Sequence, residues 1–325
     1  MIRPGDVGEA VAARGAYRAG GTDLHARRRL GLSDGDIVDL RALEELRGVE
    51  ADAGGARIGA LTRIATIAGH PAVVEGWPAL SLTAGALATP QIRAVGTLGG
   101  NLLQHNRCPY YRHPGFTCYR SGGSSCPARE GDHRHGVIFD LGPCVAPHPS
   151  SLAMALMAYD ATAVVSGDRR LTMSQLLGDG SDGSRHHRLD EGDVMIAVEL
   201  PPALLGERAA YLRATGRALA EWPIVEAVCR LRLAGGSTIE RPAVAVGGVA
   251  PVPLRLNHVE EALAGLGAAD LSGQEEAAAL STTEVTPLAM TGHKVPLLRN
   301  VVLEAVRRAV EGDAGSESAI GELGL

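Results

Sequence analysis

Short apolar runs alternate with amphipathic segments along most of the chain, a pattern typical of mixed α/β structure. Compact apolar runs predict strands at 37–40, 56–61, 162–165 and 194–200. Apolar positions with a period near 3.6 predict helices at 61–68, 79–88, 151–159, 259–266 and 297–310. Periodicity alone does not separate strands from short helices at 209–213, 224–233 and 243–249.

Two stretches interrupt this pattern. Residues 104–149 are polar and turn-forming, and residues 178–184 form a connector rich in Gly, Ser and Asp. A long irregular stretch inside a domain is usually functional or disordered, and the cysteines that it contains favour function. Together with a break at Pro201-Pro202, the pattern predicts a first domain over 1–200 with an insert at 104–149, a second domain over 205–311, and a frayed tail over 312–325.

Composition narrows the classes of protein. Aromatic residues make up 3% of the 325 residues, so the core must be built from Ala, Val, Leu and Ile. A net charge of −6 gives no support for a nucleic-acid partner. No apolar run approaches the roughly 18 residues of a membrane span, and no signal peptide is visible. We therefore expect a cytoplasmic protein without membrane contact, while export on a partner's signal stays open.

Four of the five cysteines stand between residues 108 and 144. Such a group of thiols favours either disulfides or a soft metal centre, and a reducing compartment favours the metal. Cys229 lies in an apolar run and is predicted to be a core thiol. His133 and His135 are expected to face solvent, and no role is assigned to His186 and His187.

Two double-glycine turns are candidates for binding phosphate. The first is Ala19-Gly20-Gly21-Thr22-Asp23-Leu24, where Thr22 and Asp23 are suited to cap a following helix. The second is Thr97-Leu98-Gly99-Gly100-Asn101. Each alone is more often an ordinary tight turn, but two together are suited to the two phosphates of a dinucleotide. Neither is a G-x-G-x-x-G fingerprint, so a Rossmann site is not indicated.

These turns, followed by Pro149-Ser150-Ser151-Leu152-Ala153, occur in the order found in one family. With 245–255 and 291–295, they make the chain resemble the FAD-binding medium subunit of molybdenum hydroxylases, the family of xanthine dehydrogenase and carbon monoxide dehydrogenase. The resemblance implies an α+β fold: a two-subdomain FAD-binding fold of the vanillyl-alcohol-oxidase/PCMH type, then a smaller α+β C-terminal domain. It places FAD contacts at Ala19, Gly20, Gly21, Thr22, Asp23, Leu24, Thr97, Gly99, Gly100, Asn101, Ser150, Ser151 and Arg213.

The cysteine-rich stretch resembles the [4Fe-4S] insert of certain aldehyde oxidoreductase and hydroxybenzoyl-CoA reductase flavin subunits. By position, the ligands implied are Cys108, Cys118, Cys126 and Cys144. Four thiolates are the complement of such a cluster. A four-cysteine zinc site uses the same ligands, but usually in C-x2–4-C pairs, which are absent here. Whether the cluster relays electrons or only braces the loop is left open by the sequence.

Two positions depart from the family pattern. Ser151 stands where the family usually has Asp near the flavin, and Arg213 stands where relatives often have Lys. Arg keeps the positive charge, so FAD binding is still expected, and the departures leave the electron partner undetermined.

The residues implied for FAD and for the cluster do not overlap in the sequence. Cys118→Ser should therefore remove the iron–sulfur signal while leaving much of the FAD bound.

The resemblance implies an electron-transfer subunit, an oxidoreductase flavoprotein carrying FAD and a [4Fe-4S] cluster. Its expected partners are a molybdopterin-binding large subunit, which oxidises the substrate, and a [2Fe-2S] small subunit, which supplies electrons. Two alternatives remain: a stand-alone FAD-dependent oxidoreductase, and a non-catalytic assembly subunit whose loop is stapled by a metal. The substrate and the terminal acceptor are not encoded in recognisable form.

Overall fold

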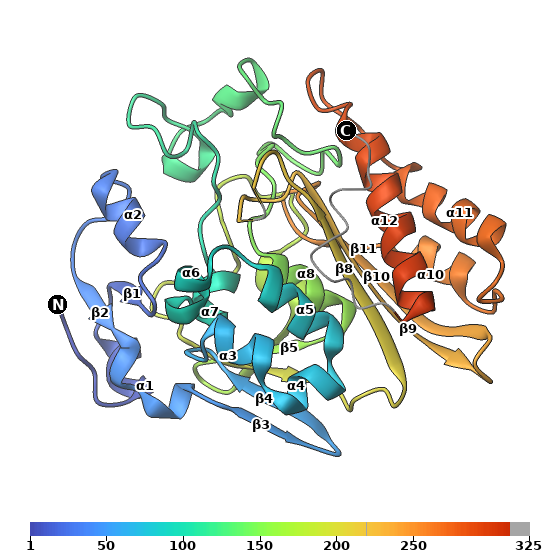
Figure 1. The fold of residues 1–325 in the computed structure, drawn as a ribbon. Helices are drawn as coiled ribbons and strands as arrows, with labels where there is room; N and C mark the ends of the chain where they lie inside the picture. Colours follow the sequence, from blue (N-terminus) through green and yellow to red (C-terminus); the bar gives the residue numbers. More distant parts are fainter. Residues whose placement is uncertain (219, 313–325) are drawn as a thin grey trace.

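The computed structural model describes residues 1–218 and 220–312, which form three sheets (Figure 1). A parallel pair near the N-terminus joins β1 (Ala16–Arg18) and β2 (Ile37–Asp39). An antiparallel sheet has the order β3 (Val49–Asp52), β4 (Gly55–Gly59), β7 (Met195–Leu200), β5 (Thr162–Val165) and β6 (Arg169–Thr172). A second antiparallel sheet has the order β11 (Leu254–Arg255), β10 (Thr238–Gly247), β9 (Val225–Ala234) and β8 (Glu207–Ala214).

Helices cover these sheets, and most of those in the first half are short. Pro begins α4, α5 and α6, where its missing N–H would have no helical partner in any case. The helices of the first half are α1 (Val7–Ala12), α2 (Leu24–Arg29), α3 (Ile64–Gly69), α4 (Pro71–Gly76), α5 (Pro78–Ala86), α6 (Pro90–Val95), α7 (Leu98–Leu102), α8 (Ser151–Ala158) and α9 (Met173–Leu177). Those of the second half are α10 (Asn257–Leu263), α11 (Leu271–Ala279) and α12 (Lys294–Glu311).

The four-stranded sheet is buried on both faces. Along β9, Val228 belongs to the core that contains α5 and α8, whereas its neighbours Ala227 and Cys229 belong to the core that contains α10, α11 and α12. Figure 1 shows these two groups of helices on opposite sides of the sheet. A strand covered on both faces is apolar at successive positions, so its sequence shows no alternation. This explains why the sequence pattern could not separate strand from helix at 224–233.

The insert between α7 and α8 is irregular, as predicted, apart from two 3₁₀ turns, Tyr119–Ser121 and Pro127–Arg129. It has a small core of its own, built on Ala128, Val137 and Val145. It is also bonded to the C-terminal half, because the N–H groups of Ile138 and Phe139 both donate to the carbonyl of Val249. The insert therefore has a defined place over the rest of the fold, seen at the top of Figure 1.

Most expected elements are present, with ends shifted by a few residues. The strand at 162–165 is confirmed, and Cys229 is a fully buried thiol, as predicted. Thr97–Asn101 is not a simple turn, because it begins the short helix α7. The predicted frayed tail lies outside the described residues, apart from Gly312.

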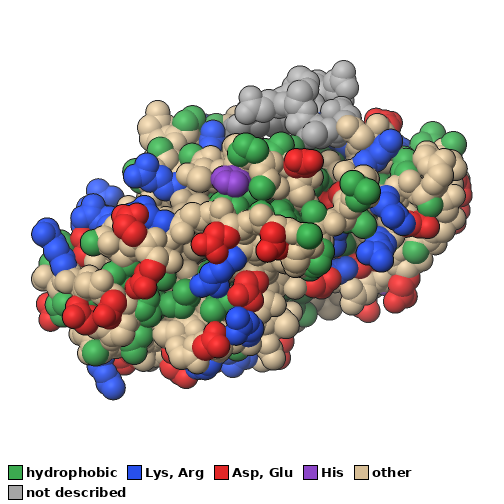
Figure 2. All heavy atoms as spheres, turned by 90° about the horizontal axis from the view of Figure 1, so that it is seen from below, with side chains coloured by type: hydrophobic (Ala, Val, Ile, Leu, Met, Phe, Trp, Pro, Cys, Tyr) green, Lys and Arg blue, Asp and Glu red, His purple; other side chains and the backbone are tan. Residues whose placement is uncertain are grey.

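The surface mixes charges of both signs. In Figure 2, acidic and basic side chains are interspersed on the face shown, with hydrophobic atoms between them. Within the described residues, no helix is both long and apolar enough to cross a bilayer.

Candidate functional site

The two glycine turns, far apart in sequence, line the same cavities. A cavity of about 330 Å³ is bordered by Thr22 and Asp23 of the first turn and by Thr97, Gly100 and Asn101 of the second. A neighbouring cavity of about 130 Å³ is bordered by the whole first turn together with Thr97, Gly99 and Gly100. The structure thus brings together the two segments that the sequence singled out as phosphate-binding candidates.

The first turn requires its glycines. A Cβ at Gly20 would collide with the carbonyl oxygen of Val95, at the end of α6. Gly21 has φ of +76°, in the left-handed region that side chains disfavour. Both features bring the main chain of the turn close to α6 and to the edge of the cavity.

The second turn is stabilised by its own side chains. Thr97 accepts a hydrogen bond from the N–H of Gly100 at 3.2 Å, which caps α7. Asn101 accepts a hydrogen bond from the Ser150 hydroxyl at 2.6 Å, and that hydroxyl in turn accepts from the N–H of Ala153 at 3.0 Å. This chain of bonds fastens the second turn to the start of α8 and places Ser150 beside it.

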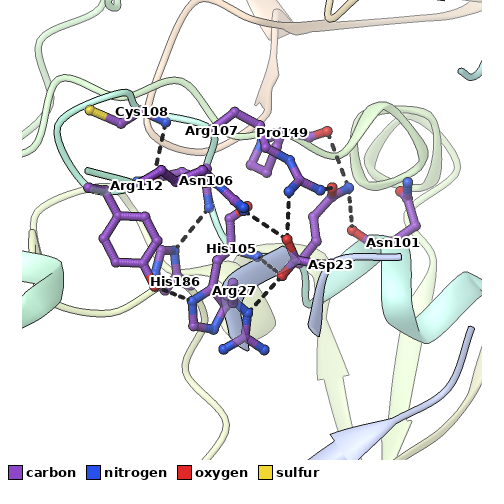
Figure 3. Close-up of polar contacts among 12 residues, drawn as sticks. Asp23, Arg27, Asn101, His105, Asn106, Arg107, Cys108, Arg112, Pro149 and His186 are labelled. Carbon is purple, nitrogen blue, oxygen red and sulfur yellow. Dashed lines mark hydrogen bonds and ion pairs between the residues drawn. The ribbon is translucent and has the colours of Figure 1, made fainter. Parts of the chain in front are cut away.

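Asp23 does not cap α2, contrary to the sequence prediction, because three guanidinium groups bind its carboxylate instead. Its Oδ1 accepts from Arg107 at 2.6 Å and from Arg112 at 2.7 Å, and its Oδ2 accepts from Arg27 at 3.0 Å (Figure 3). The N–H of His105 also donates to Oδ2, at 3.2 Å. Although burial opposes the charge of the carboxylate, the three arginines hold the pKa of Asp23 below its usual value.

Neutral histidines lie beside this cluster. The rings of His105 and His186 stack with centroids 3.9 Å apart, and Nδ1 of His105 lies 2.6 Å from the Tyr111 hydroxyl. Burial lowers the pKa of His105 to about 3 and that of His187 to about 4, and it also lowers the pKa of His186. These rings are therefore uncharged at neutral pH. The sequence assigned no role to His186 and His187, yet both are half-buried, and His186 packs against His105 and Tyr111.

Ser151 lies beside a buried carboxylate on another element. Glu226 of β9 is 1% exposed and accepts from the Tyr211 hydroxyl at 2.7 Å. Burial raises the pKa of Glu226, while the nearby Ser151 hydroxyl, the Tyr211 hydroxyl and Arg213 partly offset this. The Ser151 hydroxyl is buried and makes no hydrogen bond within the described structure.

Arg213 borders the 330 Å³ cavity from β8. Its Nη1 donates to the Ala86 carbonyl at 2.6 Å, and its Nη2 contacts the Glu221 carbonyl. Its Nε, like the Nε of Arg107, is buried without a hydrogen-bond partner in the described structure. Two arginine Nε atoms on residues of the cavity wall therefore have no acceptor within the described structure.

A larger cavity of about 700 Å³ adjoins the first. The two share Arg107, Glu221, Trp222 and Pro223. Lys294, the only lysine of the chain, borders the larger cavity and is 1% exposed. Its Nζ donates to the carbonyls of Gly248 at 2.8 Å and His135 at 3.3 Å, and burial lowers its pKa to about 7.

The four cysteines of the insert border one small cavity. They are Cys108, Cys118, Cys126 and Cys144, and none forms a disulfide. Burial raises the pKa of Cys108, partly offset by the backbone N–H groups of Tyr111 and Tyr110. Arg120 lies beside them, with its Nε 3.4 Å from the sulfur of Cys144. Across residues 1–218 and 220–312, no three His, Cys, Asp or Glu side chains are grouped so as to hold a single metal ion.

His133 and His135, the two histidines of the H-x-H in the insert, differ. His135 is exposed, as predicted, but His133 is half-buried. Its Nδ1 lies 2.9 Å from the carbonyl of Ala128, and its Nε2 accepts from the N–H of Met290 at 3.2 Å. His133 therefore links the insert to the segment before α12 and does not face solvent.

The sequence missed the arginines that bind Asp23. Arg27 follows the first turn by a few residues and belongs to a run of three arginines, 27–29. Nothing in the local sequence distinguishes it from an exposed basic residue of a surface helix. Arg107 and Arg112 flank Cys108, and this was the available signal: basic residues placed immediately around a candidate metal ligand. Their common partner lies more than 80 residues earlier in the chain, and no local pattern reveals it.

Comparison with known proteins agrees with this arrangement. Residues 1–203 match the family described as the FAD binding domain in molybdopterin dehydrogenase, and residues 210–312 match the CO dehydrogenase flavoprotein C-terminal domain. The chain is 33% identical over 255 residues to PaoB, the FAD-binding subunit of an Escherichia coli aldehyde oxidoreductase, covering 76% of this chain and 78% of that protein. It is 26% identical over 259 residues to the carbon monoxide dehydrogenase medium chain of Hydrogenophaga pseudoflava, covering 78% and 75%.

Solved structures share the fold. A carbon monoxide dehydrogenase structure from Hydrogenophaga pseudoflava matches with a TM-score of 0.74 at 22% identity, covering 97% of each chain. Quinoline 2-oxidoreductase from Pseudomonas putida 86 matches with a TM-score of 0.74 at 19% identity, again covering 97% of each chain. The predicted α+β fold, with an FAD-binding domain followed by a C-terminal domain, is therefore confirmed. The chain belongs to the family of FAD-binding oxidoreductase subunits of molybdopterin dehydrogenases.

Proposed function

We propose that this chain is the FAD- and [4Fe-4S]-carrying electron-transfer subunit of a molybdenum hydroxylase complex of the aldehyde oxidoreductase type. FAD, when bound, would accept electrons from the [2Fe-2S] centres of a small subunit and pass them to a terminal acceptor. Substrate oxidation would take place on a molybdopterin-binding large subunit. Residues 1–200, with the insert at 104–149, would form the FAD-binding domain, and residues 205–311 the C-terminal domain.

One observation carries the FAD part of the proposal: two glycine turns, remote in sequence, border the same 330 Å³ cavity. The buried, unbonded Nε atoms of Arg107 and Arg213 lie on residues of its wall, which suits a cofactor rich in oxygen acceptors. The glycines of both turns border the neighbouring 130 Å³ cavity, where main-chain N–H groups can face a phosphate. The residues present therefore fit FAD, with the turns and Arg107 suited to the diphosphate.

The cysteine cavity supports a cluster as its occupant. Four thiols border one cavity, and a [4Fe-4S] cluster takes one thiolate on each of its four irons. A four-cysteine zinc site usually draws its ligands from close C-x2–4-C pairs, which this sequence lacks. Arg120 and the N–H groups near Cys108 would stabilise the thiolates once a cluster displaces their protons.

The cavities lie next to one another. Cys108 and Tyr110 border both the cysteine cavity and the 700 Å³ cavity, and the latter shares Arg107 and Trp222 with the cavity between the glycine turns. This shared lining supports a relay role for the cluster.

The experiment is an anaerobic affinity purification of the chain from its own host, with quantitation of flavin, iron and molybdenum and identification of companion chains. The proposal expects two companion subunits and, once this chain has been separated from them, FAD with about four irons per FAD in this chain. Flavin without iron would refute the cluster. Flavin without companions would indicate the stand-alone oxidoreductase, and metal without flavin would indicate the assembly subunit.

A further inference from the structure

Asp23 and the three arginines that bind it form a group of side chains with an excess of positive charge. Arg27, Arg107 and Arg112 all bind this carboxylate, and among the described residues none of the three pairs with another acid. The histidine rings beside them are uncharged at neutral pH, because their pKa values are lowered by burial. Three cations and one anion leave a net charge of about +2 in a largely buried setting. A buried excess of this size is costly unless an anion offsets it.

Two of the three arginines belong to the cysteine-rich insert, on either side of Cys108. The loop around Cys108 is closed on itself: the Arg112 N–H donates to the Cys108 carbonyl at 3.0 Å, and the Cys108 N–H donates to Oδ1 of Asn106 at 3.3 Å. Arg112 Nε donates to the Asn106 carbonyl at 2.8 Å. Both guanidinium groups are therefore positioned by the same short loop that carries the first cysteine (Figure 3).

The excess charge reaches the cavity of the glycine turns. Arg107 and Asp23 border the 330 Å³ cavity, and Arg27 and Asp23 border the smaller one. Arg107 Nη2 also donates to Gln104 Oε1 at 2.7 Å, and Gln104 Nε2 donates to the Asn101 carbonyl at 2.9 Å. The insert is thereby bonded to both turns at once. A diphosphate carries about two negative charges, which matches the excess, and guanidinium groups suit phosphate oxygens.

We infer that the cysteine-rich insert completes the diphosphate site of the flavin, with Arg107 supplying charge to the cavity and Arg112 acting as a positioning residue through Asp23. Metal bound at Cys108 would hold the loop that carries both arginines, so cluster assembly strengthens FAD binding. By linkage, bound FAD strengthens retention of the cluster to the same degree. This inference rests on the proposed function for the identity of the two groups. It predicts weaker FAD binding in Cys118→Ser, whereas the sequence alone predicted that this variant keeps much of its FAD.

The test compares FAD affinity and iron content in the holoprotein and in matched variants. FAD affinity is read from the recovery of flavin fluorescence on dilution, and iron is quantified separately. Cys118→Ser removes a proposed cluster ligand that borders neither cavity of the glycine turns. It should lose iron and weaken FAD binding roughly 10- to 100-fold, the equivalent of one lost charge-assisted hydrogen bond. Arg107→Met should weaken FAD binding to a similar extent. Arg134→Met is the control, because Arg134 is an exposed arginine of the same insert paired with Asp132, and it should change neither quantity.

A double variant separates coupling from general damage. If the coupling runs through Arg107, then Arg107→Met combined with Cys118→Ser should bind FAD about as well as either single variant. Additive losses would overturn the route through Arg107. Wild-type FAD affinity in folded, iron-free Cys118→Ser, or in wild-type protein stripped of iron by a chelator, would overturn the coupling itself. Absence of FAD or iron from the wild-type holoprotein would instead refute the proposed function.

Discussion

Lys294 makes the stability of the protein depend on pH in a way that can be calculated. Lys294 is 1% exposed, and within residues 1–218 and 220–312 its Nζ donates only to the carbonyls of Gly248 and His135. Burial lowers the pKa from 10.5 to about 7. At about 1.4 kcal/mol for each pKa unit, the charged amine is about 5 kcal/mol less favourable in the fold than in water.

The sign follows from proton binding. Because the folded pKa is the lower one, the unfolded chain holds more protons between pH 7 and pH 10.5, and the free energy of unfolding rises with pH across that window. The penalty is fully present below pH 7. Between pH 7 and pH 9 we expect Lys294 to contribute a rise of about 2 kcal/mol.

Lys294→Met removes the charge and keeps most of the apolar stem. The substitution abolishes a penalty of about 4 kcal/mol at pH 7, but it leaves two carbonyls without donors, at a cost of about 1–3 kcal/mol. We therefore expect the variant to be more stable than the wild type by about 1–3 kcal/mol at pH 7 and nearly equal to it at pH 9.

The assay is urea unfolding at pH 7, 8 and 9, followed by tryptophan fluorescence at fixed protein and FAD concentrations, with thiols kept reduced. The other titrating groups are common to both proteins, so the difference between them isolates Lys294. Lys294→Arg is the control, since its charge does not titrate in this range, and its difference from Lys294→Met should be constant with pH. Equal pH dependence in the wild type and Lys294→Met would refute the reasoning.

Three further predictions concern the first glycine turn, Ser151 and the core thiol Cys229. Gly20→Ala should lower FAD content and destabilise the fold by roughly 2 kcal/mol or more, because the new Cβ meets the Val95 carbonyl; unchanged flavin content would contradict the role of the turn. Ser151→Asp should destabilise the fold by roughly 2–4 kcal/mol, since it places a second buried carboxylate beside Glu226, whereas Ser151→Ala should be nearly neutral in the same urea titration. Cys229→Ser should cost about 1–3 kcal/mol by burying a hydroxyl in an apolar core, and any accompanying loss of iron would show that Cys229 is more than a core thiol.

Local chemistry was enough to find the candidate sites. Gly20 and Gly21 could be identified from the sequence, because both positions require glycine: Gly20 for its close approach to Val95, and Gly21 for its positive φ. The four cysteines of the insert could be identified as a group because the rest of the chain has only one other cysteine. β5 was predicted with its observed bounds, since its short apolar run is enclosed by turn residues.

The sequence pattern could not identify strands that are buried on both faces of a sheet. The residues of β9 alternate between two cores, so the strand is apolar throughout and its period does not distinguish it from a helix. The expected role of Asp23 as a helix cap was also wrong, because the partners of its side chain lie far away in the sequence. Its position suits a helix cap, and its side chain was drawn instead to arginines from a distant segment.

The sequence by itself determined the family, the turns that suit phosphate, and the thiols that suit a cluster, because each depends on residue type and short-range spacing. Only the tertiary structure decided how the sites are connected: that both turns border one cavity, that the insert supplies Arg107 and Arg112 to Asp23, and that Lys294 is buried with main-chain carbonyls as its acceptors. The physical reason is that the energy of a charge depends on the water it loses and on the partners it gains. Both are set by segments that meet only when the chain has folded.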